Sequence, residues 1–282
     1  MNGLKYDLGE QIDCGSQGKV LSAVDKQTNK VVAIKIFQTS DSIGAAGFTT
    51  EYLIHKALLG KSKRVCQVLD CIEIPQQFGL IVMEKYKQDL FTLAFASGRK
   101  LQEREVKRLF RSICLGVRDL HCCGVAHLDI KPENILLNEQ GRPFICDFGS
   151  SFIYKACSKD ERAAIIAGVR GRGTKIYAAP EIFNKDMCNP YSADIYSLGV
   201  LLHGISTGFF PTTYKNSHEI NLQPVREKLS RGCFTLLKAM LSVDPTSRPS
   251  IERVLTHPWI VTEPKLPVVT KARKMMKLYG CA

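Results

Sequence analysis

The chain has 282 residues, 45% of them apolar, and its 39 Lys and Arg residues exceed its 27 Asp and Glu residues by 12 charges. This composition is typical of a folded globular protein and excludes collagen-like, coiled-coil and disordered chains; the length suits one large domain or two lobes around a cleft. No apolar run reaches the roughly 20 residues of a membrane-spanning helix, and the first residues lack the apolar core of a signal peptide. We therefore expect no transmembrane segment and a cytoplasmic location, with the nucleus as the alternative.

The 11 cysteines indicate neither a disulfide framework nor a zinc site. An odd number leaves at least one thiol unpaired, and no two cysteines show the C-x-x-C spacing of zinc ligands. We expect reduced thiols in a reducing compartment. The positive charge alone is compatible with nucleic acid, an acidic partner or solubility, but no basic, aromatic-rich sheet supports direct nucleic-acid binding. Acidic protein partners are the expectation that remains.

The first third of the chain is predicted to be mainly β-structure with one helix. Runs typical of strands lie at 6–13, 19–25, 31–37, 65–74 and 79–83, and a helical stripe lies at 48–59. Alternation in the third run places Ala33, Lys35 and Phe37 on one face, toward the glycine turn between the first two runs. Glu51, on the core-facing stripe of the helix, is a natural partner for Lys35.

The remainder is predicted to be mostly helical. Helices are expected at 103–121, 193–207, 223–229, 233–241 and 251–255, and a hairpin at 135–137 and 144–146. A polar, glycine-bearing loop at 150–175 lies between them, and long ordered loops of this kind usually have a function. The last residues form a basic tail.

Two groups of motifs carry chemistry. Residues 15–20 (GSQGKV) and 32–35 (VAIK) combine a glycine turn, whose N–H groups can approach phosphates, with a lysine on a nearby strand. These two features alone are equally compatible with a plain turn and a surface lysine. Residues 127–134 (HLDIKPEN), followed by DFG at 147–149 and APE at 179–181, provide a carboxylate, cations and oxygen ligands. Phosphoryl transfer to a hydroxyl requires these groups.

In this order and spacing, the motifs resemble the eukaryotic protein kinase family over residues 6–260. The resemblance implies an α+β, two-lobed protein kinase fold. A small, mainly antiparallel β N-lobe with one main helix would span about 6–84, and a larger, mainly α-helical C-lobe about 87–260. A short basic C-terminal tail would follow at 261–282. Since these motifs occupy nearly all of the sequence, we expect one catalytic unit, without a second domain and monomeric.

The resemblance further implies a serine/threonine protein kinase, which transfers the γ-phosphate of ATP to Ser or Thr hydroxyls of protein substrates with Mg²⁺ as cofactor. Lys131, two residues after Asp129, and the loop Gly173-Thr174-x-x-Tyr177 favour Ser/Thr over Tyr. The alternative is a pseudokinase that acts as a binding scaffold. A pseudokinase would carry damage at the catalytic positions, and none is present.

The resemblance also implies roles for single residues. Asp129 would be the catalytic base, Lys131 would neutralise the γ-phosphate, and Lys35 would hold the α- and β-phosphates. Asn134 and Asp147 would be the magnesium ligands. The expected nucleotide-binding residues are Ile12, Gly15, Gly18, Val20, Ala33, Lys35, Glu51, Met83, Glu84, Tyr86, Asp89 and Leu136.

Other positions of the resemblance concern architecture and substrate. Thr174 matches a threonine of the substrate-binding loop, Asp194 the aspartate that supports the catalytic loop, and Arg248 the arginine that pairs with Glu181. Glu133 favours substrates with a basic residue upstream of the target, whereas the positive net charge favours the opposite. The substrate consensus therefore stays open.

Four residues deserve separate expectations. Asp13, in place of the first loop glycine, should weaken nucleotide binding without abolishing it. Leu128 replaces the arginine that clamps a phosphorylated activation loop in relatives, so we expect activity without loop phosphorylation. His55 occupies a usually apolar position between the lobes; a half-buried histidine with a hydrogen-bonded ring nitrogen is favoured over a pH sensor. Cys146 is expected to pack at the back of the nucleotide pocket rather than to react.

Overall fold

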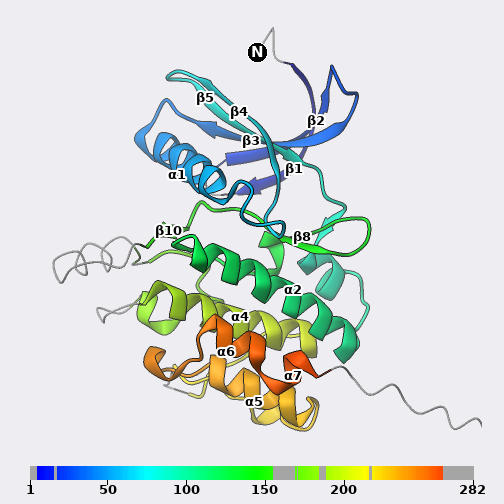
Figure 1. The fold of residues 1–282 in the computed structure, drawn as a ribbon, viewed down its shortest axis with the longest axis vertical. Coiled ribbons are helices and arrows are strands. Elements are labelled where there is room, and N and C mark those ends of the chain that lie inside the picture. The colour runs from blue at the N-terminus through cyan, green and yellow to red at the C-terminus, as the bar shows by residue number, and fades with distance from the viewer. Residues whose placement is uncertain are drawn as a thin grey trace, which may run out of the picture.

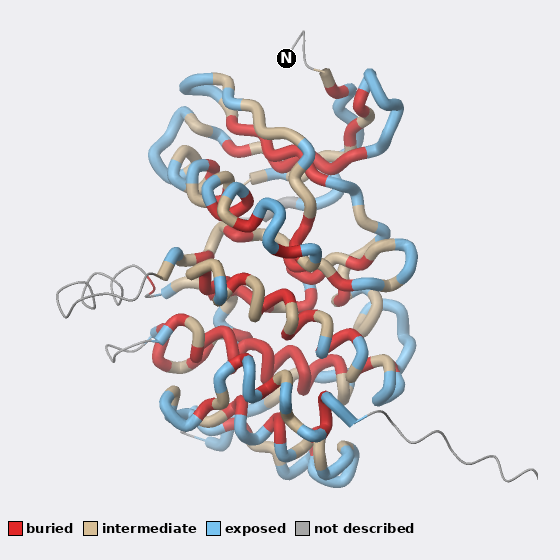
Figure 2. The backbone as a smooth tube through the Cα atoms, in the orientation of Figure 1, coloured by how far each residue is buried: buried red, intermediate tan, exposed pale blue. Residues whose placement is uncertain are grey.

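The computed structural model describes residues 5–15, 18–154, 169, 171–183, 189–215 and 218–262. The chain folds into two lobes, with a sheet and one long helix in the first and a stack of helices in the second (Figure 1). Buried segments run through the middle of each lobe and meet where the lobes touch (Figure 2). The helices of the described residues include none that is both long and apolar enough to cross a membrane.

The sheet of the first lobe has five antiparallel strands in the order β1-β2-β3-β5-β4. The strands are β1 (Tyr6–Gly15), β2 (Gly18–Asp25), β3 (Val31–Gln38), β4 (Val68–Ile74) and β5 (Phe78–Glu84). The alternation predicted for the third strand is confirmed. Val32 and Ile34 belong to the apolar cluster on one face of the sheet, and Phe37 belongs to the cluster on the face that α1 covers.

Helix α1 (Ser42–Leu58) begins six residues earlier than the stripe at 48–59 predicted. Asp41 caps it, since its carboxylate accepts hydrogen bonds from the N–H groups of Ile43 (2.9 Å) and Gly44 (2.8 Å). The first turns carry exposed residues such as Ile43, so the apolar periodicity that identifies a helix is absent there. The cap, and not periodicity, marks the start of this helix.

The second lobe is built around α4 (Pro190–Thr207), whose side chains are almost all buried. It contacts α2 (Glu103–Cys122) on one side and α5 (Arg231–Met240) on another, while α6 (Ile251–Thr256) packs against α2 and is followed by α7 (Pro258–Val261). Asn189 caps the start of α4, and Gly208, at φ 84°, ends it. The central helix therefore has definite ends, both at exposed residues, while its middle is buried.

One predicted helix, at 223–229, is wrong. Only a single 3₁₀ turn, η4 (Gln223–Val225), forms there, and a new cap at Ser230 then starts α5. Leu222 offers no side-chain cap, and seven residues are too short to form a stable helix without extensive packing.

Short elements join the lobes and carry most of the predicted motifs. Strands β6 (Gln88–Asp89), β8 (Ile135–Leu137) and β9 (Pro143–Ile145) form a small sheet, and β7 (Val125–Ala126) pairs with β10 (Phe152–Ile153). Short helical turns are η1 (Thr92–Ala96), η2 (Pro132–Asn134), η3 (Pro180–Ile182) and η5 (Pro245–Ser247). The hairpin predicted at 144–146 thus pairs one residue earlier, which leaves Cys146 outside the strand.

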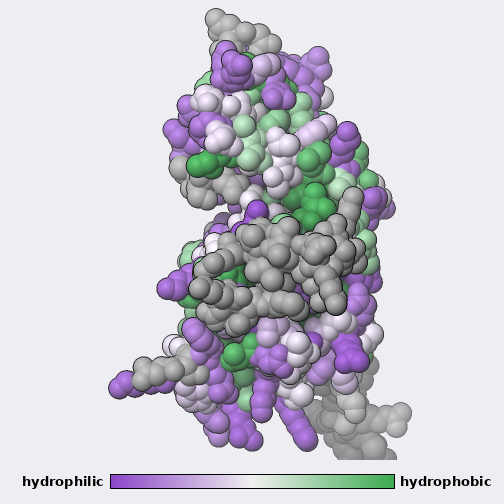
Figure 3. Space-filling view, turned by 90° about the vertical axis from the view of Figure 1, so that its left-hand side faces the viewer, coloured by the Kyte–Doolittle hydropathy of each residue, from purple (hydrophilic) through white to green (hydrophobic). Residues whose placement is uncertain are grey.

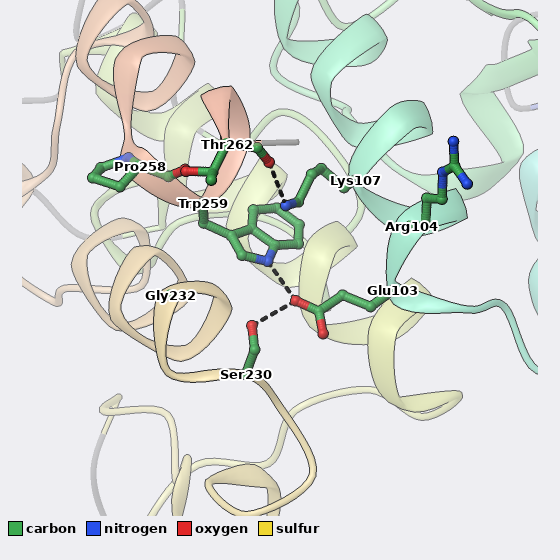
Figure 4. A pocket seen from close by; sticks show the side chains of 8 residues that line it. All are labelled: Glu103, Arg104, Lys107, Ser230, Gly232, Pro258, Trp259 and Thr262. Atoms are coloured by element: carbon green, nitrogen blue, oxygen red, sulfur yellow. Dashed lines mark hydrogen bonds between the residues drawn. The ribbon is translucent and has the colours of Figure 1, made fainter. Parts of the chain in front are cut away.

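A cavity of about 390 Å³ lies where α7 meets the start of α2 (Figure 4). Glu103 Oε1 accepts hydrogen bonds from Trp259 Nε1 (2.6 Å) and Ser230 Oγ, and Lys107 Nζ donates to the carbonyl of Thr262 (3.0 Å). These polar groups are hydrogen-bonded within the protein, so the contact joins α7 to α2 and closes the second lobe.

Candidate active site

The largest cluster of predicted site residues lines a cavity of about 580 Å³ between the lobes. The surface is indented at the junction of the two lobes (Figure 3). The predicted residues that line the cavity are Ile12, Gly18, Val20, Ala33, Lys35, Glu51, Met83, Glu84, Tyr86, Asp89, Asp129, Lys131, Asn134, Leu136 and Asp147. Gly15 does not line it; this residue pairs with Gly18 at the end of the β1–β2 hairpin.

Several lining residues were not predicted as site residues. They are Asp13, Cys66, Lys85, Lys87, Gln88, Glu133, Cys146, Ser150, Gly173 and Thr174. Asp13, Glu133, Cys146, Gly173 and Thr174 were noted in the sequence for other reasons. The rest carry no motif of their own, and folding alone brings them to the cavity wall.

Lys35 lies at the centre of a buried charge network. Its Nζ donates to Glu51 Oε2 (2.6 Å) on α1 and to Asp147 Oδ1 (2.7 Å) from the second lobe. Burial acts to lower the pKa of Lys35, but the two carboxylates outweigh it and raise the pKa, so the ammonium stays charged. For Glu51, burial raises the pKa, and the charge of Lys35 opposes that effect. The pairing of Lys35 with Glu51 expected from the sequence is present.

Asp129 lies in the catalytic loop (residues 127–134) and accepts hydrogen bonds from three donors. Its Oδ1 accepts from the Thr174 N–H (2.7 Å), and its Oδ2 accepts from Lys131 Nζ (2.8 Å) and Asn134 Nδ2 (3.1 Å). Lys131 Nζ also donates to Thr174 Oγ1 (2.8 Å). A carboxylate and an ammonium group of one loop and a hydroxyl of a distant segment therefore meet at the cavity.

Asn134 and Asp147 are the two oxygen ligands expected for a cation, and both line the cavity. The Asn134 amide donates through Nδ2 to the carbonyl (2.9 Å) and the carboxylate of Asp129, so its oxygen is the atom available for a metal. Burial acts to raise the pKa of Asp147, but Lys35 and the Gly149 N–H bond lower it. A charged carboxylate and an amide oxygen are ligands that Mg²⁺ prefers.

Asp147 adopts a left-handed backbone at φ 61°, which directs the following Phe148 into the core. The Phe148 ring is fully buried, with its centroid 5.0 Å from that of His55 and 5.4 Å from that of His127. His127 is fixed in turn, because its Nε2 bonds the Cys146 carbonyl (3.0 Å) and its Nδ1 accepts from the Asp129 N–H (3.2 Å). This packing connects α1 to the catalytic loop.

The hydrogen bond predicted for the His55 ring is wrong. His55 is only 8% exposed, and its Nε2 is buried without a hydrogen-bond partner among the described residues. Its ring instead packs at nearly a right angle against that of Phe148. Burial, with a smaller contribution from Lys35, lowers the pKa of His55 to about 4.

Asp194 supports the catalytic loop from below, as the sequence suggested. It is fully buried on α4, and its carboxylate accepts the N–H groups of His127 (2.9 Å) and Leu128 (2.8 Å). Leu128 adopts φ 63°, so these bonds hold an unusual backbone conformation. His121 Nε2, 2.8 Å from the same carboxylate, is a further partner that no sequence motif indicated.

Arg248 and Glu181, which the sequence predicted to pair, are in contact at the APE motif. Arg248 donates to Glu181 through Nη1 (2.6 Å) and Nη2 (2.8 Å) in a bidentate pair, which is buried. Arg248 also donates to the carbonyls of Ser192 (3.0 Å) and Ser242 (2.8 Å), so the guanidinium is fully engaged. This pair ties the end of the loop to α4 and to the segment before α6.

Tyr86 and Asp89 lie in the segment that connects the lobes. The Tyr86 hydroxyl accepts from the Gln67 N–H (3.3 Å), and its ring lies 4.9 Å from that of Phe144, so the side chain packs behind the segment. Asp89 pairs with Leu136 in the small sheet and accepts from the Thr92 N–H (2.6 Å). The Tyr86 side chain is thus held by contacts with Gln67 and Phe144, and the residue also lines the cavity.

Cys146 packs among apolar residues beside Cys66, and burial raises its pKa well above the usual value. A thiol in this state is a weak nucleophile, in agreement with the packing role expected for it.

A model of the family described as "Protein kinase domain" matches residues 6–260. The chain is 32% identical over 271 residues to the maternal embryonic leucine zipper kinase of Xenopus tropicalis, covering 93% of this chain and 40% of that protein. It is 32% identical over 300 residues to the SNF1-related protein kinase catalytic subunit alpha KIN12 of Arabidopsis thaliana (96% of this chain, 56% of that protein).

It is also 29% identical over 276 residues to the CBL-interacting protein kinase 5 of Oryza sativa subsp. japonica, which covers 90% of this chain and 55% of that protein. The chain thus spans between 40% and 56% of the length of these three relatives. The two-lobed fold, with its antiparallel sheet and helical second lobe, agrees with the family match. The chain belongs to the protein kinase family.

Proposed function

We propose that this chain transfers the γ-phosphate of ATP to Ser or Thr hydroxyls of proteins. One observation carries the proposal: Asp129, Lys131 and Thr174 meet at the edge of a cavity that also holds the charge network of Lys35 and Asp147. A phosphate donor and a hydroxyl acceptor would then share one site. A pseudokinase would be expected to lack part of this network, and the network is whole.

The residues at the cavity fit a nucleotide with magnesium. Lys35 provides a fixed charge for phosphates, and Ala33 lies beside Met83 across β3 and β5, where both line the cavity wall. Asn134 and Asp147 would hold Mg²⁺, which supplies charge neutralisation of the phosphates when bound. Asp13 lies on the same wall, and its negative charge would oppose the phosphates.

The chain's own groups then have separate tasks. The Asp129 carboxylate orients the acceptor hydroxyl and takes its proton at Oδ2 or Oδ1, while Lys131 balances the charge that develops on the transferred group. The Thr174 N–H and hydroxyl hold Asp129 and Lys131 in place. Phe148 closes the floor of the site against α1, so Lys35 and Asp147 stay at 2.7 Å.

Protein substrates and partners are part of the same proposal. Glu133 lines the mouth of the cavity and would contact a basic residue near the target, whereas the net charge of +12 favours acidic protein partners. The monomeric state and the cytoplasmic location stay predictions from the sequence.

The test compares the natural chain with Asp129→Asn in transfer of radiolabelled phosphate from ATP to a generic basic protein. We expect kcat to fall by about 10²- to 10⁴-fold, because the amide cannot accept the proton. Mg-ATP should still raise the melting temperature of both proteins, since Lys35 and Asp147 are intact. Equal transfer by the two proteins would reject the assignment of Asp129.

A further inference from the structure

The two ends of the segment between DFG and APE lie together in the structure. At the first end, Ser151 is 1% exposed, its Oγ donates to the His127 carbonyl (3.1 Å), and its N–H donates to that of Phe148 (2.9 Å). The next residue, Phe152, pairs with Ala126 in the β7–β10 ribbon. This end is therefore bound to the catalytic loop.

The second end is also bound to the core. Val169 is fully buried, and the Gly171 N–H donates to the Ile182 carbonyl (3.0 Å). Gly173 has φ 82°, and a Cβ at this position would lie 2.1 Å from the Leu128 carbonyl oxygen. The loop therefore passes directly against the catalytic loop before Thr174 bonds Asp129.

Arg172 joins these two ends. Its Nη1 donates to the carbonyls of Ser150 (3.2 Å) and Ser151 (3.0 Å), and its guanidinium lies 6.0 Å from the centroid of the Phe152 ring. Burial lowers the pKa of Arg172, but an arginine remains charged in proteins. Hydrogen bonds from a charged donor are stronger than neutral ones. One side chain thus connects the residues after DFG with the residue before Gly173.

We propose that Arg172 is a positioning residue that keeps the substrate-side loop, Gly173 and Thr174, against Asp129 and Lys131. The inference rests on the proposed function and adds how the same site is held in order. The charged guanidinium of Arg172 donates to carbonyls of the chain itself. The residue before Asp129 is Leu128, which has no charge with which to bind a phosphate. Arg172 would therefore order the loop without phosphorylation.

The test uses Arg172→Met, Arg172→Lys and, as matched control, Arg111→Met, which removes an exposed arginine on α2. All proteins are assayed both untreated and after phosphatase treatment. We expect Arg172→Met to lower kcat/KM for a protein substrate by about ten- to a hundred-fold, because two charge-assisted bonds are lost. The KM for ATP and the rise in melting temperature with Mg-ATP should stay unchanged, since the Lys35 network is untouched. Arg172→Lys should recover part of the loss, because an ammonium can reach one of the two carbonyls.

Any of these results would overturn the inference: Arg172→Met as active as the natural chain, equal losses in Arg172→Lys and Arg172→Met, an equal loss in Arg111→Met, or a natural chain that phosphatase inactivates. Parallel loss of ATP binding and melting temperature in Arg172→Met would assign the residue to general stability and also overturn it. If Arg172→Met does not fold, partial activity of Arg172→Lys with normal KM for ATP supports the inference, and full activity overturns it. A natural chain that binds ATP but is inactive even without phosphatase treatment would instead refute the proposed function.

Discussion

Replacing His55 by leucine should make the protein less sensitive to acid. The His55 imidazole is buried against Phe148, its Nε2 has no partner among the described residues, and its pKa is lowered to about 4 from the ordinary value of 6.5. Between about pH 4 and pH 6.5, the unfolded chain therefore binds up to one more proton than the folded chain. Stability contributed by the neutral form is complete above pH 6.5 and is lost as the pH falls toward 4.

The size of the effect follows from this difference in pKa. A shift of 2.5 units between 6.5 and about 4 corresponds to roughly 3.4 kcal/mol when the titration is complete, and to about 2 kcal/mol at pH 5. At pH 7.5 the same linkage is worth about 0.1 kcal/mol. Leucine does not titrate. The free energy of unfolding of His55→Leu, relative to that of the natural chain, should therefore be about 2 kcal/mol higher at pH 5 than at pH 7.5.

The measurement is urea unfolding of both proteins at pH 7.5 and pH 5. Ile54→Val, a change in the adjacent fully buried residue, is the control, because it should destabilise by about 1 kcal/mol equally at both pH values. A gain from His55→Leu that is the same at both pH values would refute the reasoning, since it would mean that the folded chain protonates His55 as readily as the unfolded chain.

Two further substitutions probe the loop and its anchor. Arg248→Leu should lower the free energy of unfolding by about 3–5 kcal/mol, measured by urea unfolding, because the buried Glu181 carboxylate loses both bonds of its pair; a cost below about 1 kcal/mol would contradict this expectation. Gly173→Ala should lower kcat/KM for a protein substrate by about tenfold or more, because φ 82° and the Leu128 carbonyl leave no room for a Cβ. Unchanged kcat/KM in the alanine variant would show that the loop does not need its present path.

Most of the site could be predicted because its residues follow one another in short motifs. The pairing of Lys35 with Glu51 followed from strand alternation and the helical stripe, and the pair is 2.6 Å apart in the structure. The positions of Asp129, Lys131 and Asn134 are local to one loop and needed little tertiary information. The errors fell where local patterns are weak: the start of α1 at an exposed turn, and the short segment at 223–229.

The partners of single side chains could not be read in the same way. His121 at Asp194 and Arg172 at the Ser150 and Ser151 carbonyls carry no motif, because they bond atoms whose position depends on how distant segments pack. A ring nitrogen of His55 was expected to have a partner, but the ring packs against Phe148 and its Nε2 has none among the described residues. Periodicity shows which face of an element is buried but not which atoms it meets there.

The order and spacing of the motifs indicated, through their resemblance to the protein kinase family, a two-lobed α+β fold, and the family match over residues 6–260 agrees with it. These properties depend on residues that are close together in the sequence, so they can be predicted from the sequence without a structure. Tertiary structure alone decided that Lys35 reaches Asp147, 112 positions away, and that Arg172 joins the two ends of the segment between DFG and APE. Such contacts arise only when distant segments have packed together, because a hydrogen bond requires two atoms within about 3 Å and the sequence contains no distances.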